Sequence, residues 1–134
     1  VSDGSLADHE MHHERYEIPD ATYDAVRSAL AAGRRVVAVG TTSTRVLEHV
    51  FAGPDVPRRG STDLFIVPGH AWSCVGALLT NFHLPRSTLI ALVMAFAGES
   101  TTRVAYERAI AERMRFYSFG DAMFVHGHPV VAHR

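Results

Sequence analysis

The chain has 134 residues, 47% of them hydrophobic, which suits one globular domain. All 13 basic residues are arginine, which excludes a Walker-loop lysine, a Schiff-base lysine and a serine–lysine dyad. With 14 acidic residues the formal net charge is −1, which excludes a strong general attraction to nucleic acid. The single cysteine, Cys74, excludes an internal disulfide framework and a cysteine-rich zinc module.

The sequence contains no segment typical of a membrane span or a signal peptide. The longest apolar run, residues 89–97, is too short to cross a bilayer, and no basic segment followed by an apolar one opens the chain. We therefore expect no membrane partner and a cytoplasmic location. The chain starts at Val1 and its first residues are typical of the middle of a protein, so we expect a piece of a longer chain.

Hydrophobic spacing and turn residues predict alternating helices and short strands. The first half is expected to form a strand over 15–18, a helix over 20–33 with Asp20 as N-cap, a buried strand over 36–39, and a helix with Val46, Leu47, Val50 and Phe51 on its inner face. The second half is expected to form strands over 64–67 and 77–79, helices over 88–97 and about 101–117, the latter with Tyr106 and Ile110 on its apolar stripe, and a strand over 122–125. This order predicts an α/β fold with a mixed or largely parallel buried sheet flanked by helices, in one segment over residues 1–134.

The turn after the second predicted strand has the residues of an anion-binding site. Gly40 permits a tight turn, and Thr41, Thr42 and Ser43 follow with hydroxyl and backbone N–H groups at a helix N-terminus. Arg45 adds a guanidinium that suits a carboxylate or phosphate. The alternative is that Thr42 or Ser43 is simply an N-cap. The pattern alone names no ligand.

A second polar segment, residues 80–88, lies between two apolar elements. Its Asn81 and its hydroxyl groups, Ser87 included, can hold a hydroxylated ligand. His83 can move a proton near neutral pH, and Arg86 can bind a phosphate or carboxylate. The alternative is a structural turn in which Ser87 or Thr88 caps the following helix.

Residues 8–14 are dense in histidine and carboxylate side chains, which suit a metal ion. His9, Glu10 and His13 match the spacing of a zinc-protease helix, so a metallohydrolase is one alternative. That motif needs an amphipathic helix, and this stretch has almost no apolar flank. No third ligand follows at the expected spacing, and we expect no metal.

Three stretches together resemble one family. They are VVAVGTTSTR at 36–45, LLTNFHLPRSTLI at 78–90 and FYSFGDAMF at 116–124. Their order and spacing resemble the S-adenosylmethionine:tRNA ribosyltransferase-isomerases of queuosine biosynthesis, and the HEMHHE stretch at 9–14 is similar too. The likeness runs along nearly the whole chain and covers only the C-terminal part of a family member.

The resemblance implies an enzyme that transfers the ribosyl part of S-adenosylmethionine to 7-aminomethyl-7-deazaguanine at the tRNA wobble position. Rearrangement then gives the epoxycyclopentane of epoxyqueuosine, with loss of adenine and methionine. S-adenosylmethionine and tRNA are thus the implied partners, the first as a substrate, and no prosthetic group is expected.

This chemistry needs a base to remove a proton next to the sulfonium and has room for an acid to assist adenine departure. By residue type the candidates are His83, Asp121, His12 and Glu14. The turn from Gly40 to Arg45 suits the methionine carboxylate or a tRNA phosphate.

The resemblance also implies a two-domain fold, with this chain as the closing part of the α/β domain and the remaining part, or another chain, as a partner. Two positions depart from the family pattern: His70 stands where an aromatic residue is expected and Gly76 where an acidic one is expected. A non-catalytic ligand- or RNA-binding domain with the same fold is the alternative to an enzyme.

Overall fold

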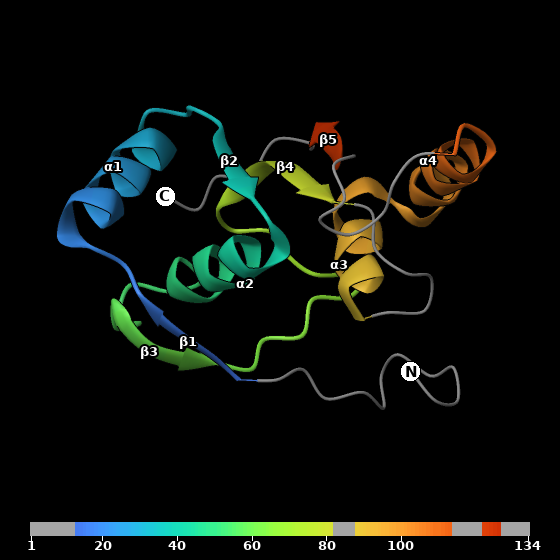
Figure 1. The fold of residues 1–134 in the computed structure, drawn as a ribbon. Helices are drawn as coiled ribbons and strands as arrows, with labels where there is room; N and C mark the ends of the chain where they lie inside the picture. The colour runs from blue at the N-terminus through green and yellow to red at the C-terminus, as the bar shows by residue number, and fades with distance from the viewer. Residues whose placement is uncertain (1–12, 82–87, 114–121, 127–134) are drawn as a thin grey trace.

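The computed structural model describes residues 13–81, 88–113 and 122–126. Its elements in chain order are β1 (Glu14–Glu17), α1 (Asp20–Ala31), β2 (Val36–Val39), α2 (Thr41–Val50), β3 (Arg59–Thr62), β4 (Val75–Asn81), α3 (Thr88–Ala97), α4 (Glu99–Ala111) and β5 (Ala122–His126) (Figure 1). The expected α/β class is confirmed. None of the described helices is both long and apolar enough to cross a membrane.

The main sheet is mixed and has β4 at its centre. Strand β2 pairs with β4 in parallel and β5 pairs with β4 antiparallel. The register aligns Val39, Leu79 and Phe124 in one row across the three strands. Because β2 and β4 are parallel, both end at the same edge of the sheet, where their last residues lie close together.

Helices α2 and α3 cover one face of this sheet (Figure 1). The core between them contains Ala38, Ile66, Trp72, Val75, Leu78, Leu92, Val93 and Phe96. On the opposite face Val37, Val39 and Phe124 are exposed. The strand expected at 36–39 is formed, but it is buried on one face only: its residues alternate between buried and exposed because the described helices cover one face.

A second, two-stranded sheet is formed by β1 and β3, which pair antiparallel beneath α2 (Figure 1). The expected strand over 64–67 is not formed, although Ile66 is buried in the core. The backbone carbonyl of Leu64 accepts a hydrogen bond from Arg45 Nε at 3.0 Å, and the Leu64 N–H is bonded to Thr62 Oγ1 at 3.1 Å. Side chains therefore satisfy both backbone groups of Leu64, and the segment packs without joining a sheet ladder.

The inner face of α2 differs from the expected one. Its buried residues are Thr44, Arg45, Glu48 and Val50, so only Val50 of the four expected residues is fully buried. Polar side chains occupy the buried stripe because each finds hydrogen-bond partners inside the fold, as described below.

The outer helices show three further differences. Pro19, and not Asp20, is the N-cap residue of α1, and the Asp20 carboxylate instead pairs with Arg58 at 2.7 Å. Helix α4 begins at Glu99 and ends at Ala111, before the expected end. Tyr106 is buried as expected, but Ile110 is exposed.

Candidate functional site

A cleft of about 390 Å³ lies at the edge of the main sheet where β2 and β4 end. It is lined by Val39, Gly40, Thr41, Thr42, Ser43, Leu79, Thr80, Asn81 and Ala122. We call it the Gly40 cleft. The turn after Gly40 and the described start of the second polar segment, Thr80 and Asn81, thus meet in one place.

Gly40 connects the two sides of this cleft. Its N–H donates to the carbonyl of Leu79 on β4 at 2.7 Å, and its carbonyl accepts from the Thr44 hydroxyl at 2.8 Å. Its backbone has φ +89° and ψ 157°, a conformation that is open essentially to glycine alone. Only glycine therefore takes the chain from β2 into α2 without strain.

The first turn of α2 faces the cleft without a side-chain cap. Gly40 occupies the N-cap position and no side chain there accepts a hydrogen bond from the helix. Thr42 and Ser43 lie inside the helix and are exposed, so the alternative that one of them is the N-cap is wrong. The first turn also contains no acidic residue. N–H donors and the positive end of the helix dipole therefore favour an anion at this position.

Arg45 and Glu14 lie away from the Gly40 cleft, between α2 and the small sheet. Arg45 is buried; its Nε donates to the Leu64 carbonyl, and its guanidinium pairs with the Glu14 carboxylate at 3.4 Å. The pKa of Arg45 is lowered, because the effect of burial outweighs the negative charges of Glu14 and Asp63, which raise it. The pair connects α2 to β1 and does not line the cleft.

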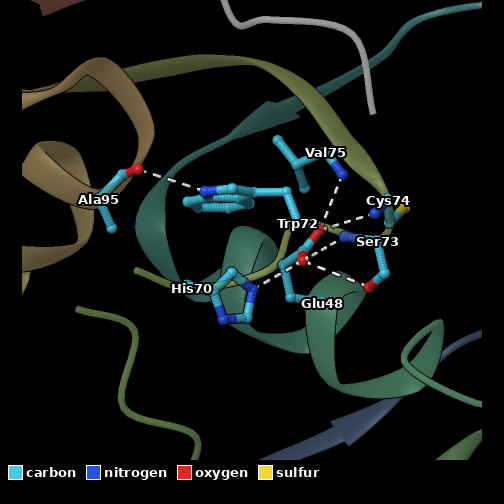
Figure 2. Close-up of polar contacts among 7 residues, drawn as sticks. All are labelled: Glu48, His70, Trp72, Ser73, Cys74, Val75 and Ala95. Atoms are coloured by element: carbon cyan, nitrogen blue, oxygen red, sulfur yellow. Dashed lines mark hydrogen bonds and ion pairs between the residues drawn. The ribbon is translucent and has the colours of Figure 1, made fainter. Parts of the chain in front are cut away.

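The strongest polar network of the described chain surrounds Glu48, which the sequence analysis did not identify (Figure 2). One carboxylate oxygen accepts from His70 Nε2 and the Ser73 N–H, both at 2.8 Å, and from the Ser73 hydroxyl at 3.3 Å. The other oxygen accepts from the N–H groups of Cys74 and Val75, both at 2.8 Å. Burial alone raises the pKa of Glu48, but the hydrogen bonds from His70 and the three backbone donors outweigh it, so the pKa is lowered.

This network fixes the start of β4 to α2. Successive donors at residues 73–75 hold one carboxylate, so β4 cannot shift along α2 without breaking them. His70, at one of the two positions that depart from the family pattern, adds a bond to Glu48 and packs edge-on against Trp72, with ring centroids 4.7 Å apart. Trp72 in turn donates its Nε1–H to the Ala95 carbonyl of α3 at 3.3 Å (Figure 2).

Gly76, the other departure, lies beneath Arg35. A Cβ at Gly76 would come within 2.8 Å of Arg35 Cγ, so the missing side chain is what lets the arginine stem lie across β4. The Arg35 guanidinium then contacts β5, with His126 Nδ1 at 3.3 Å.

Cys74 is fully buried, and burial with the nearby Glu48 charge raises the pKa of its thiol to about 12. A thiol in this state is not a nucleophile near neutral pH. Among the residues that the structure describes, no three His, Cys, Asp or Glu side chains are placed to hold a metal ion. His12, His83, Arg86, Ser87 and Asp121 lie outside the described residues, as do His9 and Glu10 of the metallohydrolase alternative.

Comparison with known proteins gives a consistent result. Residues 1–125 match the family model described as queuosine biosynthesis protein. A Thiobacillus denitrificans protein named S-adenosylmethionine:tRNA ribosyltransferase-isomerase is 57% identical over 121 residues, which cover 90% of this chain and 35% of that protein. A Rubrobacter xylanophilus protein of the same name is 56% identical, with 95% of this chain and 36% of that protein covered.

A solved structure agrees with these sequence matches. The S-adenosylmethionine tRNA ribosyltransferase of Thermotoga maritima superposes with a TM-score of 0.73 and 48% identity, covering 80% of this chain and 39% of that one. The chain thus spans little more than a third of the length of the relatives it matches. With 125 of its 134 residues matched to the family model, the chain belongs to the queuosine biosynthesis protein family.

Proposed function

We propose that this chain is the C-terminal α/β part of an S-adenosylmethionine:tRNA ribosyltransferase-isomerase. The reaction moves the ribosyl part of S-adenosylmethionine onto 7-aminomethyl-7-deazaguanine in tRNA, giving epoxyqueuosine with release of adenine and methionine. One substrate, S-adenosylmethionine, is a small molecule and the other is tRNA, and a cytoplasmic enzyme meets both. The chemistry uses no prosthetic group. Family membership supports the reaction, and the Gly40 cleft supports its location on this chain.

One observation carries the location: residues at the start of α2 and at the end of β4 line the same cleft. The α2 wall offers backbone donors and hydroxyl groups with no acidic residue beside them. The β4 wall offers Asn81, whose amide can both donate and accept hydrogen bonds. We assign to this cleft an anionic substrate group, which fits the methionine carboxylate or a tRNA phosphate.

The remaining assignments follow from residue chemistry. His12, His83 and Asp121 are the proposed acid–base residues, and Asn81, Arg86 and Ser87 are proposed to bind substrate. Glu14 and Arg45 were candidates for direct roles. Their pairing at 3.4 Å favours a positioning role, in which they hold α2 against β1.

The test is a chimera in which this chain replaces the matched segment of the Thiobacillus denitrificans relative. We expect it to release adenine from labelled S-adenosylmethionine when substrate tRNA is present. Asn81→Ala should lower that turnover about tenfold, the effect of losing roughly one to two kcal/mol of hydrogen bonding. Ser61→Ala, an exposed strand residue of the small sheet, is the matched control and should leave turnover unchanged.

Two further measurements separate the alternatives. Titration with methionine alone tests the carboxylate, and titration with substrate tRNA alone tests the phosphate. His83→Ala and Asp121→Ala should abolish turnover while leaving binding in place. A chimera that binds both substrates and releases no adenine would show a binding domain instead of an enzyme.

A further inference from the structure

The face of the main sheet opposite α2 and α3 carries a continuous apolar row. Val39 on β2 is 64% exposed and Phe124 on β5 is 44% exposed. Leu79 on β4 lies between them in the same register row. Exposed apolar residues that stand alone are ordinary, but a row spanning three strands is typical of a surface that another polypeptide covers.

The sequence of β2 supports the same conclusion. Its four residues, Val-Val-Ala-Val, are apolar on both faces, and it pairs in parallel with β4. Parallel strands with this composition occur almost only in sheets that are covered on both sides. Here Ala38 points into the core and is 1% exposed, while Val37 and Val39 on the other face remain in solvent. One side of β2 therefore has the residues of an interior, and none of the described helices covers it.

The exposed row is continuous with the Gly40 cleft. Val39 and Leu79 belong to the row and also line the cleft, and Ala122, on the same face of β5, lines it too. A polypeptide packed on the row would therefore also form a wall of the cleft.

The relatives supply the occupant. Each carries about two thirds of its length outside the segment that this chain matches, and the solved Thermotoga maritima chain likewise. We propose that the face carrying Val37, Val39, Leu79 and Phe124 is the surface on which the remainder of the family chain packs, and that this packing closes the Gly40 cleft. The closing of the cleft rests on the proposed function; the packing on the face does not.

Cysteine labelling tests the packing directly. Val39→Cys and Val104→Cys are matched probes, because Val104 on α4 is 62% exposed and lies away from this face. The native Cys74 is fully buried and should stay unlabelled. Each probe is labelled with a soluble maleimide in the 134-residue chain and in the full-length chimera, and the modified position is identified by peptide mass.

In the isolated chain both probes should react quickly. In the chimera Val39→Cys should react at least about tenfold more slowly, whereas Val104→Cys should keep its rate. Equal rates for Val39→Cys in the two proteins would overturn the proposal. So would slow labelling in the isolated chain that depends on protein concentration, since a second copy would then be the occupant.

Thermal unfolding provides a second test of the packing, for use if the chimera folds poorly. Val39→Glu should lower the thermal unfolding temperature of the chimera and leave that of the isolated chain unchanged, whereas Val104→Glu should affect neither. Equal responses of the chimera to the two substitutions would contradict the proposal. Adenine release from the chimera with Val39 intact tests the proposed function separately: protection of Val39→Cys together with no turnover by the Val39 chimera would leave the packing in place and remove the function.

Discussion

Helices α2 and α4 begin with nearly the same backbone geometry. Gly40 precedes α2 with φ +89° and ψ 157°, and Gly98 precedes α4 with φ +93° and ψ 150°. In each case a buried threonine four residues later donates its hydroxyl to the glycine carbonyl: Thr44 at 2.8 Å and Thr102 at 2.7 Å. Neither helix has a side-chain cap at its start. The local turn alone thus gives no reason to assign a ligand to one helix and not the other.

The two helix starts differ in charge and in their neighbours. The first residue of α4 is Glu99, which complements the helix dipole and pairs with Arg103 at 2.6 Å. The first residue of α2 is Thr41, and its first turn has no acidic residue. The start of α2 also shares the Gly40 cleft with Asn81. An uncompensated helix start facing a second polar strand end is what distinguishes the candidate site from an ordinary turn.

The largest expected effect comes from Glu48→Gln, which tests whether the Glu48 carboxylate holds α2 in position. The amide would present an NH₂ group to donors at residues 70 and 73–75, leaving at least one buried donor unpaired. We expect a loss of about 3 kcal/mol in the free energy of unfolding, measured by denaturant titration.

The matched control is Glu112→Gln. That carboxylate is exposed and bonds only to Arg108 among the interactions that the structure describes, so its loss should cost about 0.5 kcal/mol or less. Similar losses for the two variants would show that the Glu48 network does not position α2.

The pH dependence of stability gives the next effect. Hydrogen bonds lower the pKa of Glu48 in the fold, so this group stabilises the fold above the ordinary glutamate value of about 4.3. That stabilisation is lost as the pH falls through the lowered pKa of the folded state. Urea unfolding followed from about pH 6 to about pH 3 should show a steeper loss for the wild type than for Glu48→Gln. Parallel curves would refute the assignment.

Gly40→Ala and Gly98→Ala compare the two helix starts directly. Both glycines have the same left-handed geometry and open space where a Cβ would lie, so each alanine should cost about 1 to 3 kcal/mol in thermal unfolding. Only Gly40→Ala should also lower adenine release by the chimera, because only that turn lines the cleft. Equal effects on turnover would remove the distinction between the two turns.

The smallest effect comes from exchanging the first residues of the helices. Thr41→Glu should stabilise the isolated chain by about 0.5 kcal/mol, and Glu99→Thr should destabilise it by a similar amount. In the chimera Thr41→Glu should weaken binding of the anionic substrate, since its carboxylate would take the ligand's place, while Glu99→Thr should leave binding intact. Tighter binding by Thr41→Glu, seen in calorimetry, would argue against an anion in the cleft.

The parts of the site that sequence predicts are those with local signals. Gly40 between a β-branched strand and a run of four hydroxyl residues marks a strand-to-helix turn, and Asn81 ends an apolar strand. That these two meet depends on the parallel pairing of β2 with β4, which no local pattern specifies. The same limit applies to the open face of β2, because an apolar strand indicates burial without saying which chain provides it.

Glu48 shows why the rest could not be predicted. A glutamate in a helix is normally exposed, and only the loop at residues 70–75, far along the chain, supplies the donors that make its burial favourable. The strand predicted at 64–67 does not form for a related reason. Ile66 is buried as its apolar side chain predicts, but the Leu64 carbonyl accepts a hydrogen bond from Arg45 instead of from a neighbouring strand. Hydrophobic pattern predicts the interior, and long-range hydrogen bonds decide the pairing.

The order of the strands also affects how the chain folds during synthesis. Strand β5 comes last of the described elements but occupies an edge of the main sheet, next to the apolar central strand β4. A ribosome that has released the chain as far as α4 has produced β2 and β4 without β5, so one edge of β4 is still free to pair with another chain. Substitutions that slow the docking of β5 should therefore raise aggregation of the nascent protein more than they lower its equilibrium stability.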